Sequence, residues 1–426
     1  MRRFALLLCL LPSLLSVFSA NNDRFEIVKE SGRYRVAVNG ASMYIKGVGG
    51  TNRLDIASAN GANAFRTWGG TVEAVKKNVE MAKANNMYIM QGIALTKDVN
   101  AYYDEKYKNE KREEVRLLAE TFKECPQIFA WGIGNEVELG KANVAEMWKF
   151  IDELACIIKS IDKKHLVANV LCIPFALDSV AAYAPNLDYV GINSYGSIDK
   201  LGEMIENTAY KGPFMVTEWG PSGFWEMPTT AWKAPIEQNS EEKRIVYEER
   251  YNNYILSNPR CMGSFVFLWG QKEERTPTWF SMFVEGNVDG LPLKGEKTPM
   301  VEAMQRVWTG KEPTQTAPVL KKFTLNGKEA IESVTVKPNA TLKGEAFAVD
   351  KEGGKLKYVW EVLKEATVLG FGGSYEPRPE RVGQVALTEE NNHEVSIGNP
   401  GNYRLYVYVL DNTGYVATAN IPFRVE

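Results

Sequence analysis

Residues 128–136 read IFAWGIGNE, an apolar run that ends in an amide, Asn135, and a carboxylate, Glu136. A run of this length without a polar interruption is typical of a strand buried on both faces, as in a parallel sheet. The run PFMVTEWG, residues 213–220, has the same design and carries Glu218 near its end. Two buried strands that each end at a carboxylate predict a polar site at one edge of such a sheet.

Six further apolar runs of strand length accompany these two, and amphipathic stretches separate them. In one such stretch, residues 71–86, Val72, Val75 and Val79 recur at the spacing of one helix face. Eight strand and helix units between residues 43 and 310 match the size of a closed (β/α)8 barrel, so we expect an α/β fold of this type. The expected strands are 43–49, 63–69, 87–93, 128–136, 166–171, 187–195, 213–220 and 263–271.

An open, doubly wound sheet is the alternative to a closed barrel. It is disfavoured because KGVGGTN, residues 46–52, lacks the GxGxxG spacing of a dinucleotide-binding turn. The segment ahead of the barrel, residues 24–43, alternates between apolar and polar residues like a β-hairpin. We expect this hairpin to close the bottom of the barrel, within a catalytic domain that spans residues 21–310.

The C-terminal part has a different composition. Residues 311–318 are rich in Pro and Thr and indicate a linker. Residues 319–426 contain short strand-like runs between Gly, Asn and Pro turns, which predicts a small all-β immunoglobulin-like sandwich with Trp360 in its core. Tyr406 and Tyr408 are candidates either for a sugar platform or for packing on a neighbouring domain.

The first twenty residues, MRRFALLLCLLPSLLSVFSA, have the basic start, apolar stretch and small final residues of a signal peptide. A membrane anchor is the alternative, but the apolar stretch is short and Pro12 and Ser13 interrupt it. We therefore expect an exported protein, either periplasmic, at the cell surface or secreted, with no membrane span after cleavage.

Composition removes several classes of function. A hydrophobic content of 45% is that of a soluble globular protein, and a net charge of -3 without long charged blocks argues against nucleic-acid binding. Only two histidines occur, His165 and His393, which leaves too few imidazole groups for us to expect a His-based triad or a zinc site. We expect no metal, no cofactor and a monomer, with chemistry that comes from carboxylates.

Four cysteines follow the signal peptide, and none forms a CxxC pair. Export would permit disulfides, but each cysteine lies beside an expected strand or helix, which favours buried free thiols. The four are Cys125, Cys156, Cys172 and Cys261.

Active sites of such barrels lie at the C-terminal ends of the strands, where Glu136 and Glu218 are expected to face each other. Opposed carboxylates are the groups that glycosidic bond cleavage needs: one protonates the leaving oxygen and the other attacks. An ionised neighbour raises the pKa of the acid, while hydrogen bonds from Arg66 and Tyr195 would keep the nucleophile charged.

Other polar or aromatic residues at strand ends and in the following loops are candidates for substrate contacts. Each has a plain alternative as a salt-bridge partner or as packing at the rim, but their joint placement favours a sugar site. Trp269 in particular suits a platform for the apolar face of a pyranose. The candidates are Arg66, Trp68, Asn135, Asn193, Tyr195, Trp219, Trp225 and Trp269.

The motifs WGIGNE (131–136) and VTEWG (216–220) resemble the two catalytic signatures of clan A of the retaining glycoside hydrolases. The resemblance covers residues 43 to 310 and implies Glu136 as acid/base, Asn135 as donor to the sugar 2-hydroxyl, and Glu218 as nucleophile. FRTWGG (65–70) and KGVGG (46–50) also resemble the barrel of family 2 β-glycosidases. One departure is that Asn193 and Ser194 stand where several clan members carry a His before the strand 6 Tyr.

The aromatic loops, among them the stretch around Phe224 and Trp225, predict an extended cleft and endo action on a polysaccharide. The chain is similar to bacterial endo-β-1,3-glucanases that end in an immunoglobulin-like domain, so a β-glucan is the expected substrate. Mannan, xylan and galactan stay open. So do transglycosylation, as in β-1,3-glucanosyltransferases, and, from another class, a non-catalytic carbohydrate-binding protein.

Overall fold

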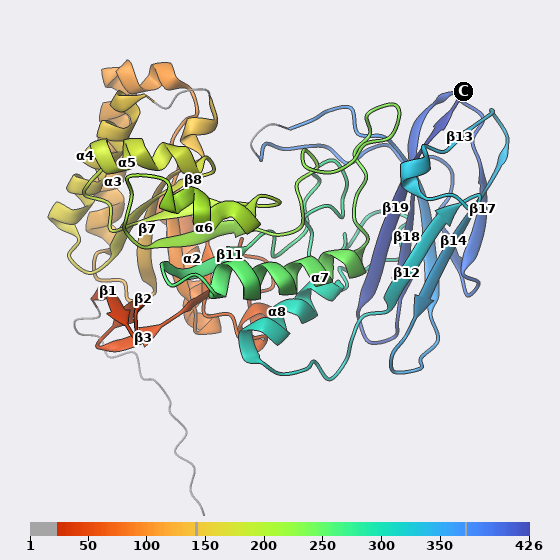
Figure 1. Ribbon diagram of the computed structural model, residues 1–426, viewed down its shortest axis with the longest axis horizontal. Helices are drawn as coiled ribbons and strands as arrows, with labels where there is room; N and C mark the ends of the chain where they lie inside the picture. Colours follow the sequence, from red (N-terminus) through yellow and green to blue (C-terminus); the bar gives the residue numbers. More distant parts are fainter. Residues whose placement is uncertain (1–23, 141–143, 371–372) are drawn as a thin grey trace, which may run out of the picture.

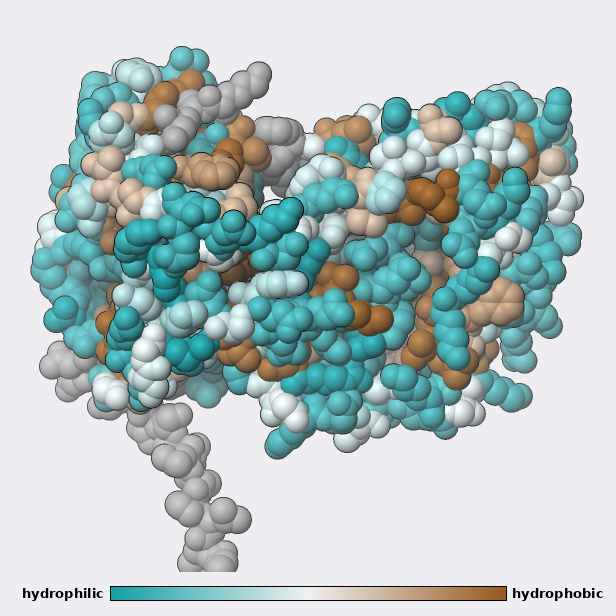
Figure 2. Space-filling view, in the orientation of Figure 1, coloured by the Kyte–Doolittle hydropathy of each residue, from teal (hydrophilic) through white to brown (hydrophobic). Residues whose placement is uncertain are grey.

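The computed structural model describes residues 24–140, 144–370 and 373–426, so the expected signal peptide, residues 1–20, lies outside the described residues. Figure 1 shows two parts side by side: a barrel with its helices, and a β domain formed by the C-terminal strands. The surface seen in Figure 2 is mainly hydrophilic, with hydrophobic residues in small groups. None of the helices in the described part combines the length and apolar character needed to cross a bilayer.

The barrel is closed and consists of eight parallel strands, which confirms the predicted (β/α)8 fold. Seven of the strands begin and end within the expected ranges; the eighth begins two residues early and ends at Val266 instead of residue 271. The barrel strands are β4 (Ile45–Gly49), β5 (Ala64–Arg66), β6 (Tyr88–Ile93), β7 (Ile128–Asn135), β8 (Leu166–Leu171), β9 (Tyr189–Asn193), β10 (Phe214–Trp219) and β11 (Cys261–Val266).

Some of the helices around the barrel, α2, α3 and α7, begin at a residue whose side chain caps them. At the start of α2, the Thr71 side chain accepts a hydrogen bond from the Ala74 N–H, and at α7 Asn239 and Glu242 form a capping box. The buried side of α2 carries Val75 and Val79, as the helical spacing predicts. The helices are α1 (Leu54–Ala59), α2 (Val72–Asn85), α3 (Glu105–Phe122), α4 (Ala145–Ile161), α5 (Leu177–Tyr183), α6 (Ile198–Glu206), α7 (Ser240–Arg250) and α8 (Pro299–Thr309).

The N-terminal strands β1 (Phe25–Glu30), β2 (Arg33–Val38) and β3 (Ala41–Met43) form a small antiparallel sheet. Phe25 and Val36 of this sheet pack in one apolar cluster with residues inside the barrel, such as Phe129 and Phe265. The sheet therefore closes the bottom of the barrel, as expected of the hairpin, and leaves the other end for the site.

The β domain consists of two sheets that share one core. Trp360 lies in that core with 1% of its surface exposed, as predicted. Tyr406 and Tyr408 alternate with core residues and point to the opposite face of their sheet, where they pack with Leu291 and Leu293 of the barrel part. They serve domain packing and are buried, so they form no sugar platform. One sheet contains β12 (Val319–Leu325), β14 (Thr341–Val349) and β17 (Asn392–Ser396); the other contains β13 (Thr335–Val336), β15 (Lys357–Lys364), β16 (Ala386–Thr388), β18 (Gly401–Leu410) and β19 (Val416–Val425).

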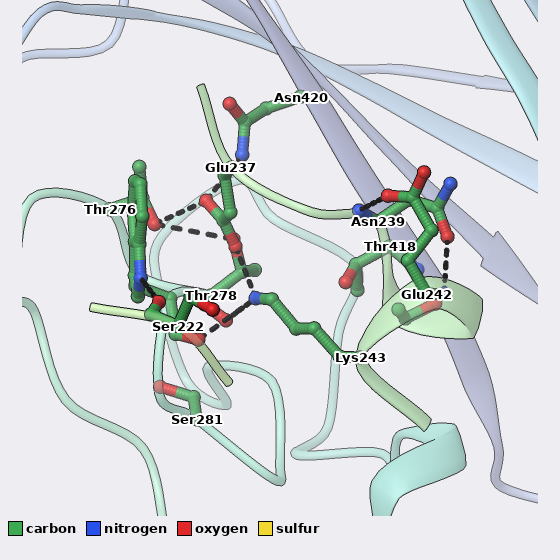
Figure 3. Close-up of polar contacts among 12 residues, drawn as sticks. Ser222, Glu237, Asn239, Glu242, Lys243, Thr276, Thr278, Ser281, Thr418 and Asn420 are labelled. Carbon is green, nitrogen blue, oxygen red and sulfur yellow. Dashed lines mark hydrogen bonds and ion pairs between the residues drawn. The ribbon is translucent and has the colours of Figure 1, made fainter. Parts of the chain in front are cut away.

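A buried ionic network joins the two parts (Figure 3). Lys243 of α7, 1% exposed, donates from Nζ to Glu237 at 2.5 Å and to the carbonyl oxygens of Thr278 and Trp279. The Glu237 Oε2 atom accepts from the Asn420 amide of β19 at 2.6 Å. Since Lys243 and Glu237 are both buried and multiply hydrogen-bonded, removal of one would leave the other as an unpaired buried charge.

A second group of charges lies at the same interface. Arg378 of the β domain donates to Glu285 at 2.8 Å and to Glu361 at 2.8 Å. Glu273, in the loop after β11, hydrogen-bonds to Glu285; burial of Glu273, and next the charge of Glu285, raise its pKa to about 9. In the folded protein, Glu273 therefore keeps its proton at neutral pH.

This protonation predicts how stability depends on pH. Because the pKa of Glu273 is raised from 4.5, the folded protein binds an extra proton between these two values, and its stability falls as pH rises through that window. Glu273→Gln supplies an uncharged donor permanently, so its Tm at pH 8 should rise by roughly a few degrees and decline less up to pH 9. Thermal unfolding across pH measures this, with Glu380→Gln, at an exposed Lys364 pair, as control. Equal pH slopes in both variants would contradict the protonated state.

Candidate active site

The first carboxylate reaches the barrel mouth because the end of β7 is irregular. The pairing of β7 with β8 shifts register between Ile133 and Asn135, and Gly134 has a φ of 76°. A Cβ atom at Gly134 would lie 3.0 Å from Val137 Cγ1, so glycine fits this position in both conformation and space. Glu136 follows with a φ of 52°, which is uncommon for a residue with a side chain. This bulge ends the strand and turns Asn135 and Glu136 toward the pocket.

The second carboxylate, Glu218, is held by three donors at the end of β10. Its Oε1 atom accepts from Arg66 Nη1 at 2.9 Å and from Trp68 Nε1 at 2.7 Å. Its Oε2 atom accepts from the Tyr195 hydroxyl at 3.1 Å. Burial, and next the charge of Glu218, raise the pKa of Tyr195 well above 10, so this hydroxyl stays a donor. The arrangement fixes a carboxylate in one orientation, with its charge compensated.

A chain of amides sets the orientation of Asn135. Its Oδ1 atom accepts from Arg66 Nη2 at 2.5 Å and from Asn193 Nδ2 at 3.2 Å. The Asn193 amide is oriented in turn by Thr217, whose hydroxyl donates to Asn193 Oδ1 at 2.8 Å. With its oxygen occupied, Asn135 presents the Nδ2 group, a hydrogen-bond donor, to the pocket.

Glu136 lies in a different electrostatic environment. Burial, and next the charge of Glu218, raise the pKa of Glu136. Asn193 Nδ2, which donates to Glu136 Oε1 at 2.8 Å, and Lys97 Nζ, 3.3 Å from Glu136 Oε2, act in the opposite direction. A carboxyl with a raised pKa beside a charged carboxylate is the pairing that a general acid and a nucleophile require.

Lys97 offers a test of this electrostatic balance. Lys97→Met removes a positive charge that lowers the pKa of Glu136, so that pKa should rise further. If Glu136 is the acid, the basic limb of the kcat/KM profile against pH should move to higher pH, with activity at the optimum reduced less than about tenfold. Lys123→Met, at an exposed ion pair with Glu120, is the control. A basic limb that stays in place would argue against Glu136 as the titrating group.

The pocket has a volume of about 830 Å³ and lies at the C-terminal ends of the barrel strands. Seven of the ten predicted site residues line it: Trp68, Asn135, Glu136, Asn193, Tyr195, Glu218 and Trp225. Arg66 is buried beneath it and contacts Glu218 and Asn135, so its place is to hold these two groups. Among the described residues, no group of His, Cys, Asp and Glu is arranged to hold a metal ion.

Two predictions of substrate contact are wrong. Trp219 is completely buried against Tyr247 and Tyr251 in the helix layer, because it follows Glu218 on the strand and so points to the opposite face. Trp269 is also completely buried: it packs on Trp308 and donates from Nε1 to the Arg53 carbonyl. The strand β11 ends at Val266, which places Trp269 in the turn that follows the strand.

Several pocket residues were not among the predictions. Lys97 follows β6, and a charged residue just after a barrel strand is a signal that the sequence does contain. Phe267 directly follows β11 and lines the pocket, which is the location that was predicted for Trp269. No local signal marks Gly370 and Gly373 of the β domain, because tertiary packing alone brings them to the pocket. The remaining unpredicted lining residues include Cys172, Ile173, Glu226, Leu268, Lys272, Glu274 and Arg275.

Among the described cysteines and histidines, only Cys172 lines the pocket. All four described cysteines are free thiols; Cys261 is buried, whereas Cys156 is exposed, contrary to the expectation of burial. His165 is buried below the site, where Nδ1 lies 2.6 Å from Asp162.

No family model matches the chain, and no curated protein sequence is detectably similar to it. Solved structures with the same fold do exist. A β-glucuronidase from an uncultured Clostridium species matches with a TM-score of 0.53 and 15% identity, over 68% of this chain and 54% of that protein. A GH2 β-galacturonidase from Eisenbergiella tayi, bound to galacturonate, gives 0.50 and 16%, over 68% and 55%.

A calcium-binding mutant of β-glucuronidase 2 from Bacteroides uniformis gives a TM-score of 0.50 at 13% identity, over 93% of this chain and 47% of that protein. The chain thus spans about half the length of the structures it matches. These likenesses show the fold: the barrel of this chain is similar in architecture to the barrels of these three enzymes. None of the three is an endo-β-1,3-glucanase.

Proposed function

We propose that the protein is a retaining β-glycoside hydrolase that acts by double displacement. The observation that carries the proposal is the pair of glutamates at the ends of β7 and β10 in one pocket, in opposite electrostatic environments. Glu218 is a carboxylate fixed by three donors, and Glu136 is a carboxyl whose pKa is raised. The similarity of the fold to a GH2 β-galacturonidase and a β-glucuronidase supports the same class of activity.

In the first step, Glu218 attacks the anomeric carbon while Glu136 gives its proton to the departing glycosidic oxygen. The glycosidic bond breaks and a covalent glycosyl-enzyme forms on Glu218. In the second step, Glu136, now ionised, takes a proton from a water that attacks the same carbon and releases Glu218. The Nδ2 group of Asn135 would donate to the sugar 2-hydroxyl and strengthen that bond as positive charge develops on the ring.

The charges of the pocket favour a neutral sugar. Each cation in its described lining is paired: Lys97 with Glu136, Lys272 with Glu274 at 2.6 Å, and Arg275 with Glu376 at 3.5 Å. A uronic acid, the sugar named for the structural neighbours, would bring a carboxylate that needs a cation of its own. We therefore infer a neutral substrate.

The size of the pocket favours a chain of sugars. A volume of about 830 Å³ lies near the upper end of the range of about 300–1,000 Å³ for ligand sites. Aromatic side chains, among them Trp225, contribute to its walls. We propose endo action on a β-glucan, with β-1,3-glucan as the first choice, and export of the enzyme to where such polymers occur.

A panel of polysaccharides tests the proposal. Laminarin, mixed-linkage glucan, mannan, xylan and galactan, and as uronic-acid substrates an aryl β-glucuronide and an aryl β-galacturonide, are incubated with the protein, and new reducing ends are measured beside Glu218→Gln. The proposal expects neutral β-glucans, laminarin first, to give reducing ends with the wild type only. Release from the aryl β-glucuronide or the aryl β-galacturonide alone would overturn the neutral-substrate assignment. Binding without any cleavage would identify a carbohydrate-binding protein, and products longer than the substrate would identify a transglycosylase.

A further inference from the structure

Gly370 and Gly373 of the β domain line the pocket, and one buried carboxylate of the same domain, Glu376, holds residues of the pocket wall. Its Oε2 atom accepts from the backbone N–H of Arg275 at 2.7 Å, in the loop after β11, and its Oε1 atom accepts from the Gly370 N–H at 2.8 Å. Glu376 is 3% exposed and also pairs with the Arg275 guanidinium. Both Arg275 and Gly370 line the pocket. One side chain of the β domain thus fixes two segments of the pocket wall.

From Arg275 the contacts continue to an exposed indole. The Arg275 guanidinium lies over the Phe224 ring, 4.1 Å from its centroid. Phe224 packs edge to face against Trp225, with ring centroids 4.8 Å apart. Trp225 is 58% exposed although it borders the pocket and packs edge-on against Tyr195. Trp225 is thus packed against neighbouring rings while more than half of its surface is exposed. A large aromatic side chain held in this way is suited to stacking on the C–H face of a sugar ring.

The network of Figure 3 holds the bases of two loops: the loop after β10, which carries Phe224 and Trp225, and the loop after β11, which carries Arg275. Asn420 of the β domain binds Glu237, which lies between Trp225 and α7 in the chain, and Glu237 accepts from Thr276 of the other loop at 2.6 Å. Thr418 donates its N–H to the Ser240 hydroxyl at 2.9 Å. The β domain therefore holds the loop after β10 through Glu237 and the loop after β11 through Glu376, which is more than a spacer or an independent module needs.

We propose that the C-terminal β domain is part of the substrate site, and that Glu376 is a positioning residue that sets Trp225 as the platform for a neutral sugar unit beside the one that is cleaved. Glu376 acts through Arg275 and Phe224 and touches no sugar itself. The proposal rests on the proposed function in one respect, the binding of a β-linked oligosaccharide in this pocket. It assigns to the β domain a share in recognising chains longer than one sugar.

Calorimetric titration of the full chain tests this step, with Glu218→Gln present in every protein titrated, the wild-type reference included, so that the probes are bound and not cleaved. The probes are the hexasaccharides of β-1,3-glucan, β-1,4-glucan, β-1,4-mannan and β-1,4-xylan, and the one that the wild type binds most tightly is used thereafter. Glu376→Ala should raise its Kd by about tenfold or more, as should Trp225→Ala, because aromatic anchors carry much of a binding energy. The double variant should bind no more weakly than Trp225→Ala, since both changes remove the same platform. The control is Glu380→Gln, at an exposed site of the same domain.

Activity separates this proposal from the proposed function. For Glu376→Ala, kcat/KM on the hexasaccharide should fall at least about tenfold more than kcat/KM on an aryl β-monoglycoside, which needs no neighbouring sugar unit, whereas the control Glu380→Gln should change neither. If Glu376→Ala folds poorly, Arg275→Ala tests the same contact from the barrel side. Unchanged hexasaccharide affinity in these variants, additive losses in the double variant, or no hexasaccharide binding by the wild type would each overturn the proposal. If the wild type cleaves no glycoside but Glu376→Ala still loses hexasaccharide binding, the role proposed for Glu376 is upheld and the proposed hydrolase activity is refuted.

Discussion

Glu218→Ala abolishes hydrolysis: kcat/KM on the best substrate of the panel is expected to fall by at least about 10⁴-fold. The methyl side chain cannot form the glycosyl-enzyme, and the donors Arg66, Trp68 and Tyr195 are left facing a space without their carboxylate. Initial rates of reducing-end release measure the loss, and thermal unfolding shows whether the variant is folded. Glu302→Gln, at a buried glutamate of α8 outside the pocket, is the control.

Azide adds a diagnostic result to this variant. In the space left by Glu218, azide can attack a β-glycoside directly from the face opposite the leaving group, which inverts the anomeric carbon. Partial recovery of rate with an α-glycosyl azide as product is therefore expected. Wild-type activity in Glu218→Ala would show that Glu218 is not the nucleophile.

Glu136→Ala should produce a loss that depends on the leaving group. For oligosaccharides, whose departing oxygen must be protonated, the rate should fall by about 10²–10⁴-fold, the contribution of a general acid. For a dinitrophenyl β-glycoside, which leaves without a proton, the glycosyl-enzyme should form rapidly and then persist, because no base activates water. A burst of phenolate followed by a slow steady state is the measurement.

The same variant should differ from Glu218→Ala in its response to azide. Here azide attacks the intermediate on Glu218, so a β-glycosyl azide is the expected product. The basic limb of the pH profile should also disappear with the carboxyl whose pKa is raised by burial and by Glu218. An equal loss for oligosaccharides and activated glycosides, with the basic limb intact, would assign the proton to another group.

The barrel was predictable because its strands are buried on both faces and so read as continuous apolar runs. The positions of Glu136 and Glu218 followed from the rule that such strands deliver their last residues to one end of the barrel. The bulge at Gly134 was not predictable, because it depends on the register in which β7 pairs with β8. The residues of either strand alone do not determine that register.

The errors at Trp219 and Trp269 have different origins: Trp219 is on β10 but faces outward, whereas Trp269 lies beyond the end of β11. A position near the end of a strand does not fix the direction of a side chain, and a shift of one residue exchanges the mouth of the barrel for the helix layer. Alternation could have excluded Trp219, because Glu218 beside it was placed in the mouth. The part played by Glu376 had no signal in the sequence, because long-range packing of the β domain brings it to Arg275.

The stereochemistry of the first product tests the central claim of double displacement most directly. Proton NMR of the anomeric region, recorded in the first minutes of hydrolysis of the best β-linked oligosaccharide, distinguishes the anomers before mutarotation mixes them. Two displacements at one carbon restore its configuration, so the β anomer is expected first and the α anomer only later. Appearance of the α anomer first would mean a single displacement by water, and would contradict a covalent intermediate on Glu218.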